Sequence, residues 1–115
     1  MLEAFTRELP RALGVPPDRV ILIFDADRKA IYAGLPAGTV RGCRTRAVLA
    51  NQRLAQLARS AGLRVIDAEP VFRQHYAAGL GPLDRSPLDA HWNPAAHGLI
   101  AREVARVIEG SKATP

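Results

Sequence analysis

Two short apolar segments place the strongest constraint on how this chain can fold. Their apolar residues run continuously and do not alternate with polar ones. Residues 19–24 read RVILIF and residues 63–67 read LRVID, with a helix-length segment between them. Continuous β-branched runs of this length are typical of parallel strands that are covered on both faces. Strands joined through a helix pair in parallel with a right-handed crossover, so this order predicts an α/β fold with a parallel sheet.

The other segments supply helices that would cover this sheet. The apolar spacing, together with start and stop residues, predicts helices over 2–13, 45–61, 70–76 and 94–109. Pro10 is expected to disturb the second half of the first helix. The last helix has the clearest start, with Asn93 as N-cap and Pro94 at the first helical position, and Gly110 is expected to end it. Residues 26–42 are expected to form a loop-rich crossing.

Two strands are too few to shelter each other on both faces. Neither strand carries the charge that protects an exposed sheet edge. We therefore expect the 115 residues to form a single partial domain, with residues 110–115 as a tail. The missing strands would come from an N-terminal half that is not in this chain, or from a second copy of it.

Charge and composition argue against several classes of function. Lysine and arginine number 16 against 11 acidic residues, a net charge of +5, but they are scattered and not interleaved with aromatics, which favours a solvated surface over a nucleic-acid surface. The longest apolar run is far shorter than the ~20 residues of a membrane span, and no secretory signal opens the chain. Cys43 is the only cysteine, so no internal disulfide or cysteine metal cluster is expected. We expect a soluble protein without a cofactor, cytoplasmic by default and periplasmic if an export signal precedes this segment.

Two carboxylates follow the first strand. Asp25 and Asp27 resemble the strand-end pair of haloacid-dehalogenase phosphatases, in which the first Asp is the nucleophile and the second the acid–base beside Mg²⁺. The resemblance ends at Arg28 and Lys29, where that family has Gly and then Thr or Val, and no later acidic pair completes a magnesium site. A solvated strand end is therefore favoured. Because ligands gather at the carboxyl ends of parallel strands, both aspartates remain candidates for the rim of a cleft.

The segment LDAHWNP, residues 88–94, carries the densest polar chemistry of the chain. In extended backbone Asp89 and His91 project to the same side. The carboxylate can then bond Nδ1–H, fix the imidazole tautomer and leave Nε2 to take a proton. Trp92 can pack against the last helix and shield the pair from water, and Asn93 is a candidate for the border of the same cleft.

Two other interpretations of this segment stay open. Asp89 and His91 can be loop residues that make local hydrogen bonds, with Trp92 as a core anchor. A metal site would add His97 as a third ligand to this pair. No second histidine shares the face of His97 four residues away, so no metal is expected.

The block LDAHWNPAAHGLIAREVARVI resembles the C-terminal block of the SGNH, or GDSL-like, hydrolase superfamily, in which Asp-x-His-Trp-Asn-Pro-x-Gly-His leads into the last helix. The short spacing of the pair is that of the branch related to polysaccharide O-acetylation proteins. The resemblance covers about residues 18–109, with Ala96 in place of the usual Gly. It implies a three-layer α/β/α, flavodoxin-like parallel sheet, present here only in part, and ester chemistry with Asp89 as the acid and His91 as the base.

The resemblance also implies a serine nucleophile in a Gly-Asp-Ser block, and no such block can be matched in this chain. Ser60, Ser86 and Ser111 lie in a turn, a loop and the tail, without the strand-to-helix setting that presents a nucleophile. The expected function is that of the C-terminal part of an esterase, or of a carbohydrate O-acetyl esterase or transferase, which provides the Asp–His pair and acts on an acyl ester. The alternative is a non-catalytic α/β module that pairs through an exposed sheet edge.

Overall fold

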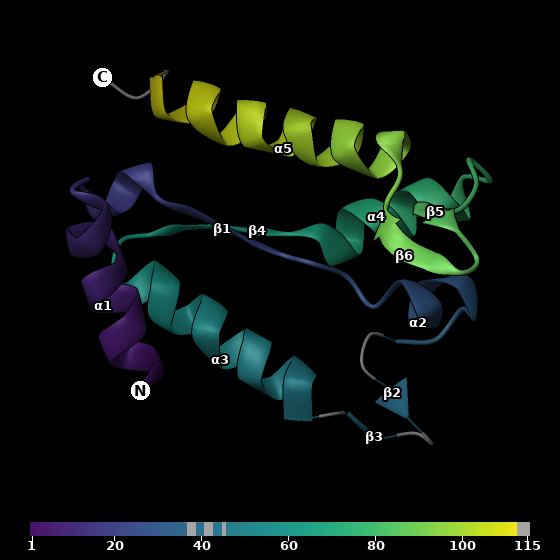
Figure 1. The fold of residues 1–115 in the computed structure, drawn as a ribbon, viewed down its shortest axis with the longest axis horizontal. Helices are drawn as coiled ribbons and strands as arrows, with labels where there is room; N and C mark the ends of the chain where they lie inside the picture. Colours follow the sequence, from purple (N-terminus) through teal and green to yellow (C-terminus); the bar gives the residue numbers. More distant parts are fainter. Residues whose placement is uncertain (37–38, 41–42, 45, 113–115) are drawn as a thin grey trace.

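Two parallel strands lie at the centre of a mixed α/β fold (Figure 1). The computed structural model describes residues 1–36, 39–40, 43–44 and 46–112. Strand β1 (Ile21–Phe24) pairs in parallel with β4 (Arg64–Asp67), and Leu22 lies opposite Val65 in the register. The pairing confirms the α/β class that the two apolar runs predict.

Helices lie on both sides of this strand pair. They are α1 (Leu2–Leu13), the 3-10 turn η1 (Pro17–Arg19), α2 (Arg28–Tyr32), α3 (Arg46–Ser60), α4 (Ala68–Ala77) and α5 (Pro94–Lys112). Figure 1 shows α5 on one side of the strands, and α1 with α3 on the other. A hydrogen bond of 2.8 Å from Arg64 Nη1 to the Val107 carbonyl ties α5 to β4.

The first helix has the predicted bounds, whereas α4 begins two residues earlier than predicted. Helix α1 continues through Pro10 and ends at Gly14, whose φ of 67° lies in the left-handed region. Because Pro10 stands in the last turn, it removes one hydrogen bond without ending the helix. Helix α4 begins before Pro70, because the Asp67 carboxylate accepts a hydrogen bond from the Glu69 N–H at 3.0 Å and caps the helix there.

Two further predictions are corrected. The last helix does not stop at Gly110 but continues through Lys112, so the first residues of the predicted tail are helical. A glycine within a helix costs only about 1 kcal/mol relative to alanine, which is too little to end a long helix by itself. Residues 26–42, predicted as a loop-rich crossing, contain α2, and Asp27 caps it. Thr45, the predicted start of the second helix, lies outside the described residues.

Two short antiparallel hairpins complete the strand structure. In the first, β2 (Thr39–Val40) pairs with β3 (Cys43–Arg44), and in the second, β5 (Asp84–Ser86) pairs with β6 (Asp89–Trp92). The sequence predicts neither hairpin, because strands of two to four residues are too short to display a period. In Figure 1 the β5–β6 hairpin lies beside α2 and α4, at the end of the molecule toward which β1 runs.

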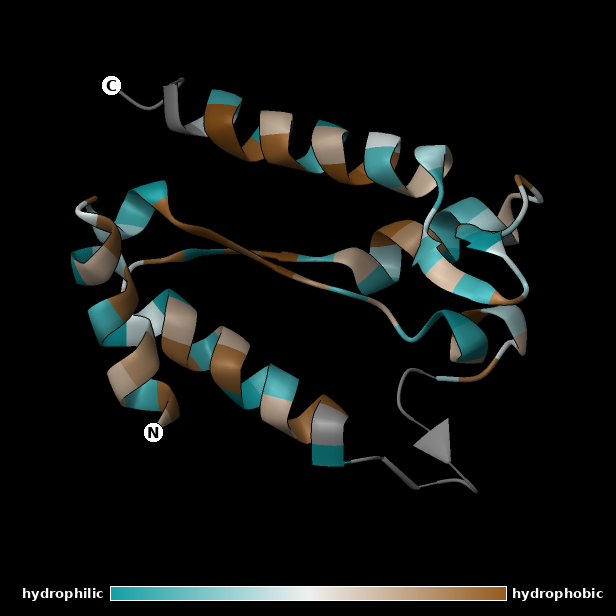
Figure 2. Cartoon of the chain, in the orientation of Figure 1, coloured by the Kyte–Doolittle hydropathy of each residue, from teal (hydrophilic) through white to brown (hydrophobic). Residues whose placement is uncertain are grey.

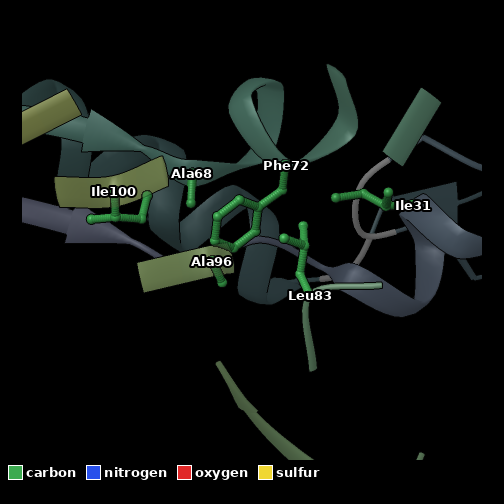
Figure 3. Close-up of a cluster of buried hydrophobic side chains, with 6 residues drawn as sticks. All are labelled: Ile31, Ala68, Phe72, Leu83, Ala96 and Ile100. Atoms are coloured by element: carbon green, nitrogen blue, oxygen red, sulfur yellow. The ribbon is translucent and has the colours of Figure 1, made fainter. Parts of the chain in front are cut away.

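The main hydrophobic core lies at the same end of the molecule, next to the β5–β6 hairpin (Figure 3). Its buried side chains come from α2, α4, α5 and the start of the hairpin, and they are Ile31, Ala68, Phe72, Leu83, Ala96 and Ile100. Phe72 is fully buried and its ring packs among the others. A second, smaller core packs α3 against the strands through Val20, Ala58 and Leu63.

One face of β1 is only partly covered. Leu22 and Val65 pack in the second core, whereas Ile23 points to the opposite face and is 42% exposed. Its neighbour on β4, Ile66, is 5% exposed. Figure 2 shows β1 as hydrophobic along its length. The prediction that both strands are covered on both faces is therefore not met at Ile23 within the described part of the chain, where the two strands alone do not shelter each other.

Replacement of Phe72 by alanine tests the main core. Removing a fully buried ring leaves a cavity, so Phe72→Ala is expected to lower the free energy of unfolding by about 3–5 kcal/mol. Urea denaturation followed by circular dichroism measures this change. Phe5→Ala is the matched control, because Phe5 is 46% exposed on α1 and should cost less than about 1 kcal/mol. Equal losses in the two variants would contradict the assignment of the core.

Candidate active site

The β5–β6 hairpin directs its side chains to two opposite faces. Asp84 lies opposite Trp92 and Ser86 opposite Asp89, with an irregularity between Asp84 and Ser86. Neighbours along a strand point to opposite faces, so the side chains of Asp89 and His91 share the face that Trp92 turns away from. The segment predicted to be locally strand-like is thus one strand of a hairpin.

Asp89 and His91 meet in the contact that their spacing predicts. The His91 ring nitrogen Nδ1 lies 2.5 Å from Asp89 Oδ1, and the backbone N–H of His91 donates to the same oxygen at 3.1 Å. These two hydrogen bonds from His91, the ring bond first, lower the pKa of the Asp89 carboxyl below its usual value. When Nδ1 carries the ring proton and donates it to this carboxylate oxygen, Nε2 is left as the basic nitrogen of the ring.

The pair lies open to solvent. The His91 side chain is 86% exposed, and the second Asp89 oxygen faces the Arg85 guanidinium at 3.7 Å. The predicted shielding of the pair by Trp92 is therefore wrong. Adjacent residues of β6 point to opposite faces, so the same alternation that exposes His91 turns the indole toward the core.

Trp92 anchors the hairpin to the core. Its ring meets Phe72 edge-on with centroids 5.6 Å apart, and the ring of His97 at 5.5 Å. The indole Nε1–H donates to Asp25 Oδ1 at 2.9 Å. The prediction that Trp92 packs against the last helix is confirmed by its contact with His97, and the sequence did not indicate its bond to Asp25.

Asp25 lies beneath the hairpin as part of an ion-pair cluster. Its Oδ1 accepts from Arg28 Nη1 at 2.6 Å as well as from Trp92. Arg28 Nε also donates to Asp84 Oδ1 at 2.5 Å, and Nη2 donates to the Ala90 carbonyl. Two acidic side chains and one backbone carbonyl thus converge on a guanidinium that is only 10% exposed.

The side chains of Asp27 and Asn93, the other two candidates for the border of a cleft, form hydrogen bonds with backbone groups. Asp27 accepts from the Ala30 N–H at 3.1 Å and caps α2. Asn93 accepts from the Ala96 N–H at 3.0 Å, which confirms it as the N-cap of α5. The amide Nδ2 of Asn93 donates to the carbonyls of Pro82 at 2.8 Å and Asp84 at 3.3 Å, so both ends of this side chain hold the hairpin against α5.

Sequence reasoning missed two residues near the pair. Arg28 was noted only because it departs from the phosphatase pattern. Its contact with Asp84 could not be predicted, because the two residues are 56 positions apart and such a contact leaves no local pattern in the sequence. Tyr32 was also missed. Its hydroxyl accepts from the Leu83 N–H at 2.8 Å at the start of the hairpin, and burial raises the pKa of the Tyr32 phenol.

The described serines do not meet the His91 ring. The Ser86 hydroxyl accepts from the Leu88 N–H at 3.3 Å within the hairpin turn. Ser60 lies at the end of α3 and lines an open cavity of about 460 Å³ between α1, η1 and α3. That cavity lies at the amino ends of the strands, where η1 leads into β1, whereas the hairpin lies toward the carboxyl ends. The side chain of Ser111 lies outside the description.

Neither a metal site nor a membrane-spanning helix is found in the part of the chain that the structure describes. Within the described ranges, no three His, Cys, Asp or Glu side chains gather where they could hold a metal ion, so the proposed ligand set of Asp89, His91 and His97 is not assembled. The same part of the chain contains no helix that is both long and apolar enough to cross a membrane.

Comparison of the chain with models of protein families, with curated proteins and with solved structures gives no match.

The charge of Asp89 sets a pH dependence of stability. A carboxyl whose pKa is lowered in the folded state stabilises the fold above its unfolded pKa, about 3.9, and loses this contribution as the pH falls through the folded value. Asp89→Asn should therefore lower the thermal midpoint at pH 6, and the difference from the wild type should shrink as the pH falls below the unfolded pKa. Thermal scans from pH 3 to pH 7 measure it. Asp18→Asn, at an exposed residue of η1, is the control. A difference that grows with acidity would contradict the assignment.

Proposed function

We propose that this chain supplies the acid–base part of a Ser-His-Asp type site that cleaves or transfers an acyl ester. Asp89 orients His91, and the serine comes from a polypeptide segment outside this chain. The observation that carries the proposal is the 2.5 Å contact between His91 Nδ1 and Asp89 Oδ1, which leaves the basic nitrogen Nε2 directed away from the carboxylate. The wider domain would be a three-layer α/β/α, flavodoxin-like sheet of the SGNH type, of which this chain holds a part.

Each residue has a defined role in this chemistry. His91 Nε2 takes the proton of the serine hydroxyl as the serine oxygen attacks the ester carbonyl. Asp89 stabilises the imidazolium that forms, and the imidazolium then gives its proton to the departing alcohol. The acyl group remains on the serine until water or an acceptor hydroxyl removes it, with His91 again taking the proton. The substrate class is an acyl ester, with O-acetylated carbohydrates as the class that the sequence resemblance implies.

The setting of the pair supports this role. Asp25, directly after β1, bonds Trp92 of the hairpin, so the pair stands near the carboxyl end of a parallel strand. Ligands of open α/β sheets bind at that end. The 86% exposure of His91 leaves its outer nitrogen open to a second polypeptide segment, which is what a serine from outside this chain requires.

A second candidate function is a non-catalytic module that pairs through its sheet edge. The strand pairing favours it, because β1 and β4 pair only with each other among the described strands and an unpaired edge can accept a further strand, which would also help to cover Ile23, 42% exposed on the face of β1. Size-exclusion chromatography with light scattering separates the two functions. A stable dimer supports the module, whereas a chain that aggregates or folds poorly supports part of an enzyme.

The tautomer of His91 tests the proposed relay. In ¹⁵N spectra recorded above the titration of histidine, His91 should carry its proton on Nδ1 and none on Nε2, because Nδ1 faces the carboxylate. His97, an exposed histidine on α5 whose ring packs on Trp92, is the internal comparison. Asp89→Asn should remove the preference of His91 for Nδ1. A wild-type His91 protonated on Nε2 contradicts the relay.

Ester hydrolysis by the isolated chain tests the absence of the nucleophile. Loss of the serine from such triads lowers kcat about 10⁶-fold, so p-nitrophenyl acetate turnover should not exceed that of the His91→Ala variant. Ser86→Ala, which removes the hydroxyl of the hairpin turn, should likewise have no effect. Strong turnover that both substitutions abolish would identify Ser86 as the nucleophile and overturn this part of the proposal.

A further inference from the structure

The Arg28 side chain connects the segment that follows β1 to both strands of the β5–β6 hairpin, which is distant in the sequence. From its place at the first position of α2, the guanidinium reaches Asp25 after β1, Asp84 on β5 and the Ala90 carbonyl on β6. The last two contacts span 56 and 62 residues. The three nitrogens of one planar group each have a separate acceptor, which fixes the orientation of the group.

Ala90 is the residue between Asp89 and His91. Its carbonyl belongs to the peptide group that joins Ala90 to His91, so the direction of this carbonyl sets the backbone from which the His91 side chain projects. A hydrogen bond from Arg28 Nη2 holds that peptide against the body of the protein. A rotation of this peptide group that would carry His91 away from Asp89 breaks this bond.

The guanidinium stays charged in this position. Burial lowers the pKa of Arg28, but the hydrogen bonds and charges of Asp25 and Asp84 outweigh it and hold that pKa above its usual value. The Arg28 and Asp84 side chains are only 10% and 18% exposed, so breaking their contact would leave two poorly solvated charges without their partners.

We propose that Arg28 is a positioning residue of the Asp89–His91 pair: by holding the Ala90 carbonyl to Asp25 and Asp84 it keeps the imidazole aligned on its carboxylate. The inference rests on the proposed function, because alignment matters only if His91 moves a proton. Arg28 acts through the backbone of β6, whereas the two residues that it aligns carry the chemistry.

Arg28→Lys tests the inference. Lysine keeps the positive charge but lacks the planar, divergent N–H groups with which the guanidinium meets three separate acceptors. In ¹⁵N spectra of this chain, His91 should lose its single Nδ1-protonated form and show a mixture of both tautomers. The Asn93 N–H, which bonds the Leu83 carbonyl at 2.9 Å at the base of the hairpin, should exchange with solvent about tenfold faster, the factor expected from losing one charged hydrogen bond.

Arg64→Lys is the matched control. Arg64 is also a half-buried arginine that donates to a distant backbone carbonyl, that of Val107 at 2.8 Å, but it ties β4 to α5 and does not touch the hairpin. Its substitution should lower the thermal midpoint while the His91 tautomer stays as in the wild type. If the tautomer changes as much in this control as in Arg28→Lys, the effect is one of general stability and the inference is wrong.

Asp84→Asn keeps the test valid if Arg28→Lys does not fold. This change leaves Arg28 in place but weakens the acceptor of its Nε, so the tautomer mixture should appear to a smaller extent. A wild type that is protonated on Nδ1, with no change in Arg28→Lys or in Asp84→Asn, overturns the inference and leaves the proposed function standing. A wild type without the Nδ1-protonated form overturns the proposed function and the inference together.

Discussion

The contact of Trp92 with Phe72 is the interaction on which the arrangement of this molecule depends. It joins a short, two-stranded hairpin to the buried ring of α4, with centroids 5.6 Å apart and the planes nearly perpendicular. Such an aromatic pair contributes about 0.5–1.5 kcal/mol beyond the area that it buries. An isolated hairpin of this size is marginally stable in water, so the indole holds β5 and β6 in the fold. Because Trp92 turns inward, the alternation of side chains along β6 places Asp89 and His91 on the outer face of the hairpin.

The two faces of the β5–β6 hairpin carry different kinds of side chain. Its inner face carries the groups that hold the fold together, with Trp92 in the core and Asp84 on the buried guanidinium. Its outer face carries Asp89 and His91, which share one short contact, and the His91 side chain is 86% exposed to solvent. Water weakens the attraction between exposed charges, so the pair gains its full electrostatic strength only when another polypeptide segment covers it. The contact between carboxylate and imidazole is present, whereas the described part of the chain does not enclose it in low-dielectric surroundings.

The sequence predicts the parts of this fold that have a period or a local stop signal. The two central strands, the long helices and the N-cap at Asn93 follow from apolar runs, spacing and cap residues. The spacing of Asp89 and His91 predicts their contact, because alternation along a strand is a local rule. The hairpins are too short to show alternation, and α2 is a five-residue helix inside a glycine-rich stretch. Arg28 could not be placed, because its partners lie up to 62 residues away and no local pattern records such a distance.

Asn93 gives the hairpin a second property. Its side-chain amide closes loops of only nine and eleven residues, to the carbonyls of Asp84 and Pro82. The entropy cost of closing a loop grows with the logarithm of its length, so these contacts can form early and locally, whereas those of Arg28 must wait until most of the chain has condensed. The site therefore combines contacts that are local in the sequence with contacts between distant residues. The carboxylate and the imidazole meet through a contact that is local in sequence, and we expect their attachment to the strands, through Arg28, to form later in folding.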